Sequence, residues 1–321
     1  MAERVVPILR TEELCKEFIP GGFYQKPVRV VDRVNVEVDP GEIRGIVGES
    51  GSGKTTLARC SLRLLEPSSG SVYFDGKDLA AFSPAALRTK RQEFQMVFQD
   101  PYGSLNPSMT VEEIILEPLK IHRIGSRDSQ KQYLQELLDA VSLSEHFLER
   151  RIAELSGGQQ QRIGIARGLA LKPRLLVADE PVSSLDASVQ AQILNLLAEL
   201  QQKYALTLML ISHSLGVVHY LCNKISVMYR GRIVEEAAAD SFFRKPKHPY
   251  SLLLLHSMPT MNTILKNDAA PVGSSITAPA DSASSCSFHP RCVHAFELCR
   301  KQTPPLIEVE DGETVACFLY S

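Results

Sequence analysis

The sequence lacks an excess of charge of either sign. Its 35 lysines and arginines against 37 aspartates and glutamates leave a formal net charge of −2. A balance of this kind gives no indication of a nucleic-acid partner or of an anionic membrane surface as a ligand. We therefore expect no nucleic acid among the partners.

Long apolar runs are also missing. The most apolar of the later segments, SLLLLHSM, is far too short to span a bilayer. The first residues, MAERVVPILRTEE, lack the basic stretch followed by an apolar run that marks a signal peptide. These absences predict a soluble, cytoplasmic protein.

A disulfide framework is a third absence. The chain has seven cysteines, an odd number, and three of them stand alone, at Cys15, Cys60 and Cys222. This pattern argues against a secreted, disulfide-rich domain. Because free cysteines are usually buried, we expect these three in the core. With 321 residues, 44% of them hydrophobic, the chain suits about two domains, or one large domain with appendages.

The segment GEIRGIVGESGSGKTTLARCSLRLL matches a phosphate-binding loop. Residues 43–47 form an apolar run typical of a short strand, and Leu57, Leu64 and Leu65 follow at helical spacing. Glycines let successive N–H groups point at phosphate oxygens, and a helix N-terminus adds partial positive charge. Lys54 is expected to reach the β- and γ-phosphates, and Thr55 to bind Mg²⁺. The predicted ATP-binding residues of the loop are Gly48, Ser50, Gly51, Ser52, Gly53, Lys54, Thr55 and Thr56.

A second apolar run, RLLVADEP, ends in two carboxylates. Residues 175–178 suit a strand that is buried on both faces, and Asp179 and Glu180 follow at its carboxyl end. In this position Asp179 can hold Mg²⁺, while Glu180 can polarise the water that attacks the γ-phosphate. Together with the phosphate loop, the pair predicts a nucleotide hydrolase.

The segment LSGGQQQRIGIARGLA, residues 155–170, lies between these motifs and resembles the signature motif of ATP-binding-cassette (ABC) ATPases. Further motifs resemble those of that family and occur in its order. Gln99 resembles the Q-loop glutamine and His213 the switch histidine, while Ser184, Leu185 and Asp186 resemble the D-loop.

An aromatic residue ahead of the first core strand usually stacks on adenine in this family. Phe18 is the best-placed candidate, and Tyr24 is the second. The sequence departs from the family's pattern at Ser214, where many members carry an acidic residue after the histidine. The detailed placement of that loop is therefore left open.

The resemblance implies an α/β fold: a P-loop ABC ATPase cassette with a RecA-like core, an antiparallel β subdomain and a helical subdomain, followed by a C-terminal cysteine-containing extension. It also implies a head-to-tail dimer, in which the signature of one cassette covers the ATP of its partner. A hydroxyl and backbone N–H groups at a helix start suit this anion site. The signature residues are Ser156, Gly157, Gly158 and Gln159; the implied catalytic residues are Glu180, His213 and Gln99, and the Mg²⁺ ligands are Thr55, Gln99 and Asp179.

Two further segments resemble the peptide and nickel importer subfamily, QDPYGSLNP at 99–107 and FRKPKHPYSLLLL at 243–255. The His248-Pro249-Tyr250 triplet is interpreted as a turn that opens a helix, because proline suits the first helical position. Between residues 100 and 155 the family places the helical subdomain that receives the membrane subunits. Apolar side chains follow helical spacing there, at Tyr133, Leu134, Leu137, Leu138 and Val141.

These segments predict three parts of the chain. The nucleotide-binding domain covers residues 1–257, with the helical subdomain at about 100–165. Residues 258–285, rich in Ser, Ala, Pro and Asp, form a linker. Residues 286–321 form a four-cysteine extension of the oligopeptide/dipeptide transporter type, appended beyond that linker.

The cysteines of the extension, Cys286, Cys292, Cys299 and Cys317, are spaced C-x5-C-x6-C-x17-C. Four thiolates suit either tetrahedral Zn²⁺ or an Fe–S cluster, and the spacing does not decide between them. A reducing cytoplasm argues against disulfides, and simple burial is a further option. Some members of the subfamily hold a [4Fe–4S] cluster on cysteines of this kind, so the resemblance favours the cluster. His289 and His294 could replace a cysteine, but we expect them to face solvent.

The chain is thus identified as a member of the ABC ATPases that drive bacterial uptake of dipeptides or oligopeptides, using ATP and Mg²⁺. The expected partners are a second ABC ATPase, either another copy or a related chain, two transmembrane permease subunits and, indirectly, an extracytoplasmic peptide-binding protein. The expected location is the cytoplasmic face of the inner membrane. The alternatives are an importer of nickel, glutathione or another small solute, a soluble ABC protein and a metal-sensing regulator.

Overall fold

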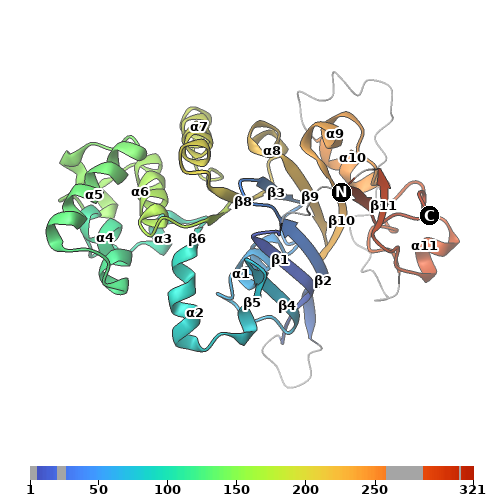
Figure 1. Cartoon of the computed structure of the whole chain (residues 1–321). Helices are drawn as coiled ribbons and strands as arrows, with labels where there is room; N and C mark the ends of the chain where they lie inside the picture. Colours follow the sequence, from blue (N-terminus) through green and yellow to red (C-terminus); the bar gives the residue numbers. More distant parts are fainter. Residues whose placement is uncertain (1–5, 20–26, 258–284, 311) are drawn as a thin grey trace. The chain divides into compact units, whose positions relative to one another are not determined.

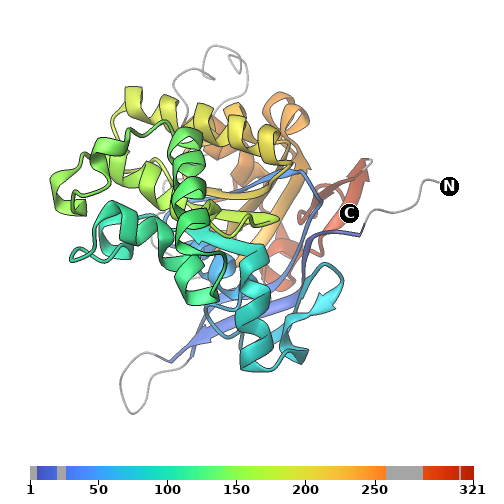
Figure 2. The ribbon, with the colours of Figure 1, turned by 60° about the vertical axis from the view of Figure 1, so that its left-hand side comes forward.

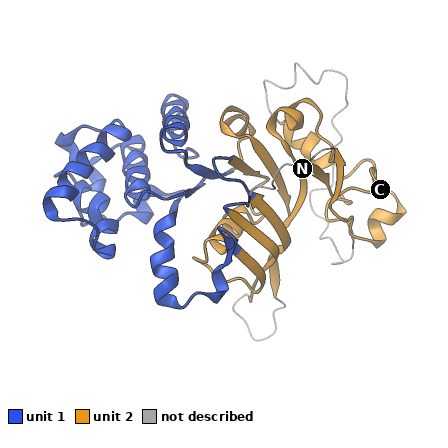
Figure 3. Ribbon diagram, viewed as in Figure 1, with its two compact units in different colours: residues 1–8, 38–42, 73–211 blue, residues 9–37, 43–72, 212–321 orange. Residues whose placement is uncertain are grey.

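The computed structural model describes residues 6–19, 27–257, 285–310 and 312–321. These residues form two compact units, each assembled from separate stretches of the chain (Figure 3). Within the described ranges, the first unit contains residues 6–8, 38–42 and 73–211, and the second contains the described residues of 9–37, 43–72 and 212–321. The predicted linker, 258–285, lies outside the described residues except for Ser285.

The first unit is built on three parallel strands in the order β8-β7-β6 (Figure 1). Every residue of β7 is buried, as the apolar run at 175–178 predicts for a strand covered on both faces. Pairing places Ala178 beside Val97 of β6, and Asp179 beside Ile211 of β8. The carboxyl ends of β6 and β7 therefore lie at the same edge. The strands of this unit are β5 (Lys77–Asp78), β6 (Phe94–Val97), β7 (Leu175–Asp179) and β8 (Thr207–Ser212).

Most of the helices of this unit gather into one bundle, in which α4, α5 and α6 contact one another (Figure 2). A capping box between Thr110 and Glu113 starts α4, because each residue's side chain bonds the other's backbone N–H. The helix predicted around Tyr133 to Val141 is confirmed as α5, which buries three leucines. The helices are α2 (Pro84–Lys90), α3 (Pro101–Ser104), α4 (Val111–His122), α5 (Arg127–Ala140), α6 (Gly157–Leu169) and α7 (Ala187–Tyr204).

The second unit contains a mixed sheet in the order β11-β12-β10-β9-β3. β3 runs parallel to β9, and the remaining neighbours are antiparallel. Three further strands lie in the order β2-β1-β4, and the last two residues of β4, Tyr73 and Phe74, belong to the first unit, where they pair with β5. The strands are β1 (Leu9–Phe18), β2 (Val28–Val38), β3 (Ile43–Val47), β4 (Ser69–Phe74), β9 (Lys224–Tyr229), β10 (Arg232–Ala238), β11 (Ile307–Glu310) and β12 (Glu313–Val315).

The predicted strand at 43–47 is confirmed as β3, and the predicted helix begins at Lys54 as α1. The helix ends at Ser61, so the expectation that Leu64 and Leu65 continue it is wrong. Arg63 takes a left-handed backbone conformation, and the Leu64 N–H bonds back to the Arg59 carbonyl, which closes the helix end. The helices of this unit are α1 (Lys54–Ser61), α8 (Leu215–Leu221), α9 (Ala239–Arg244), α10 (Pro249–His256) and α11 (Glu297–Lys301).

The C-terminal residues join the core of the second unit. β12 pairs with β10, and the Ala316 N–H donates to the Val234 carbonyl at 2.9 Å. Phe288 is almost fully buried, with its ring against those of Tyr229 and Tyr250. The expectation of an appendage beyond a linker therefore differs from the fold, because strand pairing between distant segments leaves no local signal in the sequence.

A buried carboxylate holds the start of α10 against β10. Glu235 is fully buried, and its carboxylate accepts hydrogen bonds from the backbone N–H groups of Lys247 at 2.8 Å and of His248 at 2.7 Å. Burial raises the pKa of Glu235, while these hydrogen bonds act against that shift. The partial positive charge of the helix start favours an acidic group here. Lys247 in turn forms ion pairs with Glu310 and Glu313.

His248 is the N-cap of α10, and Pro249 occupies the first helical position, as the structural interpretation of this triplet predicts. The ring Nδ1 accepts a hydrogen bond from the Tyr250 N–H at 3.0 Å. Burial lowers the pKa of His248 to about 3, so the ring is neutral in the native protein. Its neighbours include the carboxylate of Glu235 and the ring of Phe288.

We predict that His248 makes the fold sensitive to acid. The native ring does not bind a proton until the pH approaches 3, whereas the unfolded ring binds one below 6.5. Its stabilising contribution is therefore complete above pH 6.5 and is lost as the pH falls toward 3. His248→Asn keeps an N-cap acceptor without this titration. Urea unfolding at pH 7.5 and 4.5 should show the free energy of unfolding falling less in the variant, by roughly 3 kcal/mol. Equal losses in both proteins would contradict the assignment.

Candidate active site

The phosphate loop of the second unit joins β3 to α1. Lys54, the first residue of the helix, is almost fully buried, and its Nζ donates to the carbonyls of Gly48 at 2.8 Å and Glu49 at 2.9 Å. A residue outside the loop also holds it in place. The Gly231 N–H donates a hydrogen bond to the Ser52 carbonyl at 2.8 Å. The predicted residues Ser50 and Gly51 are exposed, while Thr55 and Thr56 are half-buried in the first turn of α1.

Gly53 shows why this loop requires glycine. It caps α1 in a left-handed conformation with φ of 105°, and a Cβ there would lie 2.4 Å from the Val30 carbonyl oxygen. It offers no side chain to the first N–H groups of α1, and the first turn contains no acidic residue. The helix start thus presents backbone donors next to the lysine cation and the Thr55 hydroxyl. These groups fit a phosphate chain with its Mg²⁺.

The carboxylates of the first unit lie where β7 ends. Asp179 is its last residue and is fully buried, and Glu180 follows in a left-handed conformation with φ of 45°. Gln99, two residues beyond β6, donates from Nε2 to the Glu180 carboxylate at 2.9 Å. Two residues 81 positions apart in the sequence are therefore in direct contact, because parallel pairing brings the ends of their strands to the same edge. The geometry gives Glu180 an amide partner that can orient it toward a water molecule.

The signature residues begin α6. Ser156 is the N-cap and accepts from the Gln159 N–H, while the Gln159 side chain accepts from the Ser156 N–H at 2.9 Å. Gly157 and Gly158 start the helix, and both are closely approached by neighbouring side chains. A Cβ on Gly157 would lie 3.1 Å from Leu185, and one on Gly158 would lie 2.5 Å from Val189. The signature thus packs directly against the D-loop and the start of α7.

Asp186 of the D-loop is the N-cap of α7. Its carboxylate accepts from Ser188 and from the backbone N–H of Val189, and these hydrogen bonds lower the pKa of Asp186. This capping role is an ordinary structural one, and the sequence alone did not predict it.

The remaining predicted residues lie in the second unit. His213 follows β8 and is exposed. Ser214 closes a turn, since its N–H donates to the Ser212 hydroxyl at 3.0 Å. Phe18 ends β1 with 40% of its surface exposed, and the Lys16 ammonium lies 5.3 Å from its ring centroid. Tyr24 lies outside the described residues.

The four cysteines of the extension belong to one region of the second unit. The Cys286 N–H donates to the Cys299 carbonyl at 2.9 Å. Burial raises the pKa of Cys317 to about 11, and the charges of the other three thiols add to that shift. No disulfide joins the cysteines that the structure describes. Within the described ranges, no group of three or more His, Cys, Asp or Glu side chains is arranged to hold a metal ion.

The other predictions about single residues have clear outcomes. Cys15, Cys60 and Cys222 are buried, as expected. His294 is exposed, whereas His289 is half-buried and its Nδ1 lies 2.8 Å from the Cys286 carbonyl.

In the part of the chain that the structure describes, no helix is both long and apolar enough to cross a membrane.

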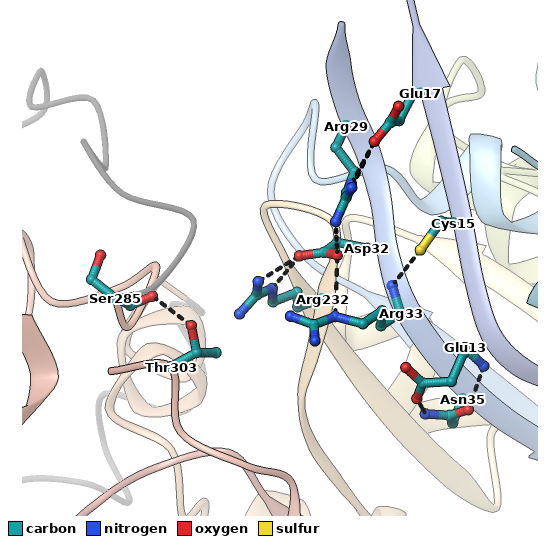
Figure 4. A network of polar contacts seen from close by, with 10 residues as sticks. All are labelled: Glu13, Cys15, Glu17, Arg29, Asp32, Arg33, Asn35, Arg232, Ser285 and Thr303. Atoms are coloured by element: carbon teal, nitrogen blue, oxygen red, sulfur yellow. Dashed lines mark hydrogen bonds and ion pairs between the residues drawn. The ribbon is translucent and has the colours of Figure 1, made fainter. Parts of the chain in front are cut away.

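A hollow of about 300 Å³ is lined by residues of β2, β10 and the C-terminal extension. On its wall, Asp32 contacts Arg29, Arg33 and Arg232 (Figure 4). Burial acts to raise the pKa of Asp32, but the hydrogen bonds from Arg232 and Arg29 prevail and lower it. Glu17 also pairs with Arg29, so two carboxylates face three arginines. The network is a structural ion-pair cluster that the sequence did not reveal.

One residue near the phosphate loop also escaped sequence reasoning. Arg291, between two of the cysteines, forms an ion pair with Glu49 inside the loop. No motif contains Arg291, and 242 positions separate it from its partner. Only the tertiary fold could reveal this contact.

The arrangement of motifs is that of a nucleotide-binding ATPase of the cassette type, and comparison with known proteins supports this class. The profile of the ABC transporter family matches residues 31–183, and that of the oligopeptide/dipeptide transporter C-terminal region matches residues 234–299. The chain belongs to the ABC transporter family, and its C-terminal part matches the oligopeptide/dipeptide branch.

Individual relatives agree with this assignment. The chain is 45% identical over 97% of its length to a Sinorhizobium fredii protein named as a peptide ABC transporter ATP-binding protein, covering 89% of that protein. It is 41% identical to the oligopeptide transport ATP-binding protein AppF of Bacillus subtilis, over 98% of both chains. The solved dimeric cassette MJ0796 superposes with a TM-score of 0.66 at 29% identity, over 72% of this chain and 98% of that one. The predicted ABC ATPase cassette fold is thereby confirmed.

We predict that Gly53→Ala disrupts the phosphate loop through both its backbone conformation and its close contact. Gly51 provides the control, because it also has a positive φ of 79° but a Cβ there would meet nothing within 4 Å. Gly51→Ala should cost about 1 kcal/mol of unfolding free energy from strain alone. Gly53→Ala should cost about 3 kcal/mol and should abolish ATP binding. Chemical unfolding and nucleotide titration of the two variants test this, and equal losses in both would contradict it.

Proposed function

We propose that this chain is the ATP-hydrolysing subunit of a bacterial ABC importer, and that it couples ATP binding and hydrolysis to uptake of dipeptides or oligopeptides through membrane permease subunits. The observation that carries the proposal is a phosphate loop with a buried lysine together with a carboxylate held by Gln99 at the end of β7, in a chain of the ABC family. The names of its relatives and the matched C-terminal region support peptides as the cargo.

In this proposal the phosphate loop binds the triphosphate of ATP. Lys54 would leave the carbonyls of Gly48 and Glu49 and bond the β- and γ-phosphates, while the first N–H groups of α1 bond the remaining oxygens. Phe18, exposed at the end of β1, would stack on the adenine. Mg²⁺, when bound by Thr55, Gln99 and Asp179, would offset charge on the phosphates.

Glu180 is the proposed general base. It would accept a proton from the attacking water, with Gln99 fixing the orientation of its carboxylate. His213 would donate a hydrogen bond to the γ-phosphate and respond to its loss. Most of the rate enhancement would come from positioning and charge stabilisation, as in other phosphoryl transfers.

The signature is proposed to act on a second chain's ATP. Ser156 already caps α6 and, with Gly157, Gly158 and Gln159, presents the helix start as an anion site. The solved relative MJ0796 is a dimer, which supports a head-to-tail pair of cassettes here. The partner cassette is another copy or a related chain. Two permease subunits at the cytoplasmic face of the inner membrane, and a peptide-binding protein outside it, complete the proposed importer.

The expected domain organisation remains part of the proposal. It consists of a nucleotide-binding domain over residues 1–257, with a helical subdomain at about 100–165, and an extension over 286–321. The matched oligopeptide/dipeptide region, residues 234–299, begins within the proposed nucleotide-binding domain and ends within the proposed extension.

We predict that Glu180→Gln traps the protein as an ATP-bound dimer. Glutamine keeps the size of the side chain and an oxygen that can accept from Gln99, but it cannot take a proton from water. ATP affinity should stay within about threefold of the parent, while hydrolysis falls by at least about a hundredfold and ATP-bound dimers accumulate. ATPase assays and size-exclusion chromatography with ATP measure both effects. Hydrolysis at the parental rate would rule out Glu180 as the base.

We also propose that Cys286, Cys292, Cys299 and Cys317 bind a metal centre, with a [4Fe–4S] cluster favoured over Zn²⁺. The support is chemical: all four thiols belong to one region, and the charges of three of them act on Cys317. Their side chains are not arranged as a metal site in the described fold. No step of the ATP cycle is therefore assigned to this centre.

Purification without oxygen tests the centre. A cluster predicts broad visible absorption and about four irons per chain, and both should disappear in a Cys286→Ser, Cys292→Ser variant. Cys60→Ser, at a buried position outside the extension, is the matched control. Zinc without iron would support the alternative metal, and a chain without either metal would refute the proposed centre.

A further inference from the structure

Glu49 is the one acidic residue within the phosphate loop, between Gly48 and Ser50. Its carboxylate accepts two parallel hydrogen bonds from Arg291, from Nη1 to Oε2 and from Nη2 to Oε1, each at 2.9 Å. This bidentate geometry is the strongest form of an arginine–carboxylate pair. The Arg291 side chain is 24% exposed and that of Glu49 is 42% exposed, so the pair is partly shielded from water.

The backbone of Glu49 is held at the same time. Its N–H donates to the Tyr250 hydroxyl at 2.8 Å, and its carbonyl accepts from the Lys54 ammonium at 2.9 Å. The side chain, N–H and carbonyl of one loop residue are thus each fixed by a different partner. The position of Glu49 is in this way linked to that of the lysine expected to bind phosphate.

Arg291 is itself held in place by an aromatic cluster made of Tyr229, Tyr250 and Phe288. All three rings are almost fully buried, with centroids 4.5 to 5.5 Å apart. The guanidinium carbon lies 5.9 Å from the Tyr229 ring centroid and 5.7 Å from that of Phe288. These cation–π contacts help to orient the guanidinium toward Glu49. The hydrogen bonds with Glu49 raise the pKa of Arg291, so it stays charged.

The ion pair between Arg291 and Glu49 affects nucleotide binding because Glu49 is negatively charged. A carboxylate within a loop that receives phosphates repels them unless a cation neutralises it. Arg291 supplies that cation from the cysteine-bearing extension. Without it, the loop would retain Lys54 but would also carry an uncompensated negative charge.

We infer that Arg291 is a positioning residue for ATP, which neutralises Glu49 and fixes the phosphate loop from the C-terminal extension. The inference rests on the proposed function and adds a long-range determinant of nucleotide affinity to it. Arg291 acts through Glu49 and does not itself need to touch ATP. The residues beyond 285 therefore contribute to the nucleotide site as well as to the core.

The test separates loss of neutralisation from loss of packing. Arg291→Ala should raise both the Kd for ATP and the KM for hydrolysis about tenfold, with kcat within about twofold. In the double variant Arg291→Ala, Glu49→Gln, the repelling carboxylate is also gone, and affinity should return to within about threefold of the parent. A purely structural role predicts no such rescue, because the second substitution removes a further anchor.

Control variants complete the experiment. Arg291→Lys keeps a positive charge without the bidentate geometry, and its affinity for ATP should lie between those of the parent and the alanine variant. Arg300→Ala removes an exposed arginine of the same extension and should leave ATP affinity unchanged. Circular dichroism and thermal unfolding report whether each variant is folded. If Arg291→Ala does not fold, Arg291→Gln replaces it in both the single and the double variant.

The outcomes distinguish this inference from the proposed function. A parent chain that neither binds nor hydrolyses ATP would overturn the proposed function itself. A parent that binds ATP, with a folded Arg291→Ala variant of equal affinity, would overturn the inference alone. A folded double variant that binds as weakly as Arg291→Ala would also overturn it, because neutralisation would then not be the cause.

Discussion

The conformation of the phosphate loop is the constraint on which the rest of the structure depends. A loop that turns its N–H groups toward a ligand makes few hydrogen bonds of its own, so surrounding backbone must define its shape. Gly53 lies against the Val30 carbonyl of β2, and Gly48 against the Met228 carbonyl of β9. Strands that carry no recognisable motif thus decide where the motif residues lie.

The carboxylates are positioned by the parallel pairing of strands. Because β6 and β7 run in the same direction and in register, the residues that follow them emerge at one edge, and Gln99 meets Glu180 there. The signature and D-loop are brought together differently. Two helix N-caps, Ser156 and Asp186, define their starts, and the small size of Gly157 and Gly158 allows close packing against Leu185 and Val189.

The sequence predicts the parts of this molecule whose cause is local. The strand at 43–47, the start of α1 at Lys54 and the N-cap at Ser156 follow from patterns a few residues long. Helix α1 ends earlier than its leucines suggest, because Arg63 can take a left-handed conformation that no pattern announces. The burial of Glu235 and the contact of Arg291 with Glu49 depend on segments far apart in the chain, and side-chain chemistry alone does not specify them.

The pairing of β12 with β10 has a consequence for the behaviour of the protein in solution. An uncovered outer strand offers unpaired N–H and carbonyl groups to any other chain and invites aggregation. Here β12 covers the edge of β10, and the outermost strand is β11, which has four residues and whose sequence, IEVE, alternates charge with apolar side chains. A short, acidic outer strand is a poor template for intermolecular pairing. The C-terminal segment thereby protects the sheet that supports the phosphate loop from self-association.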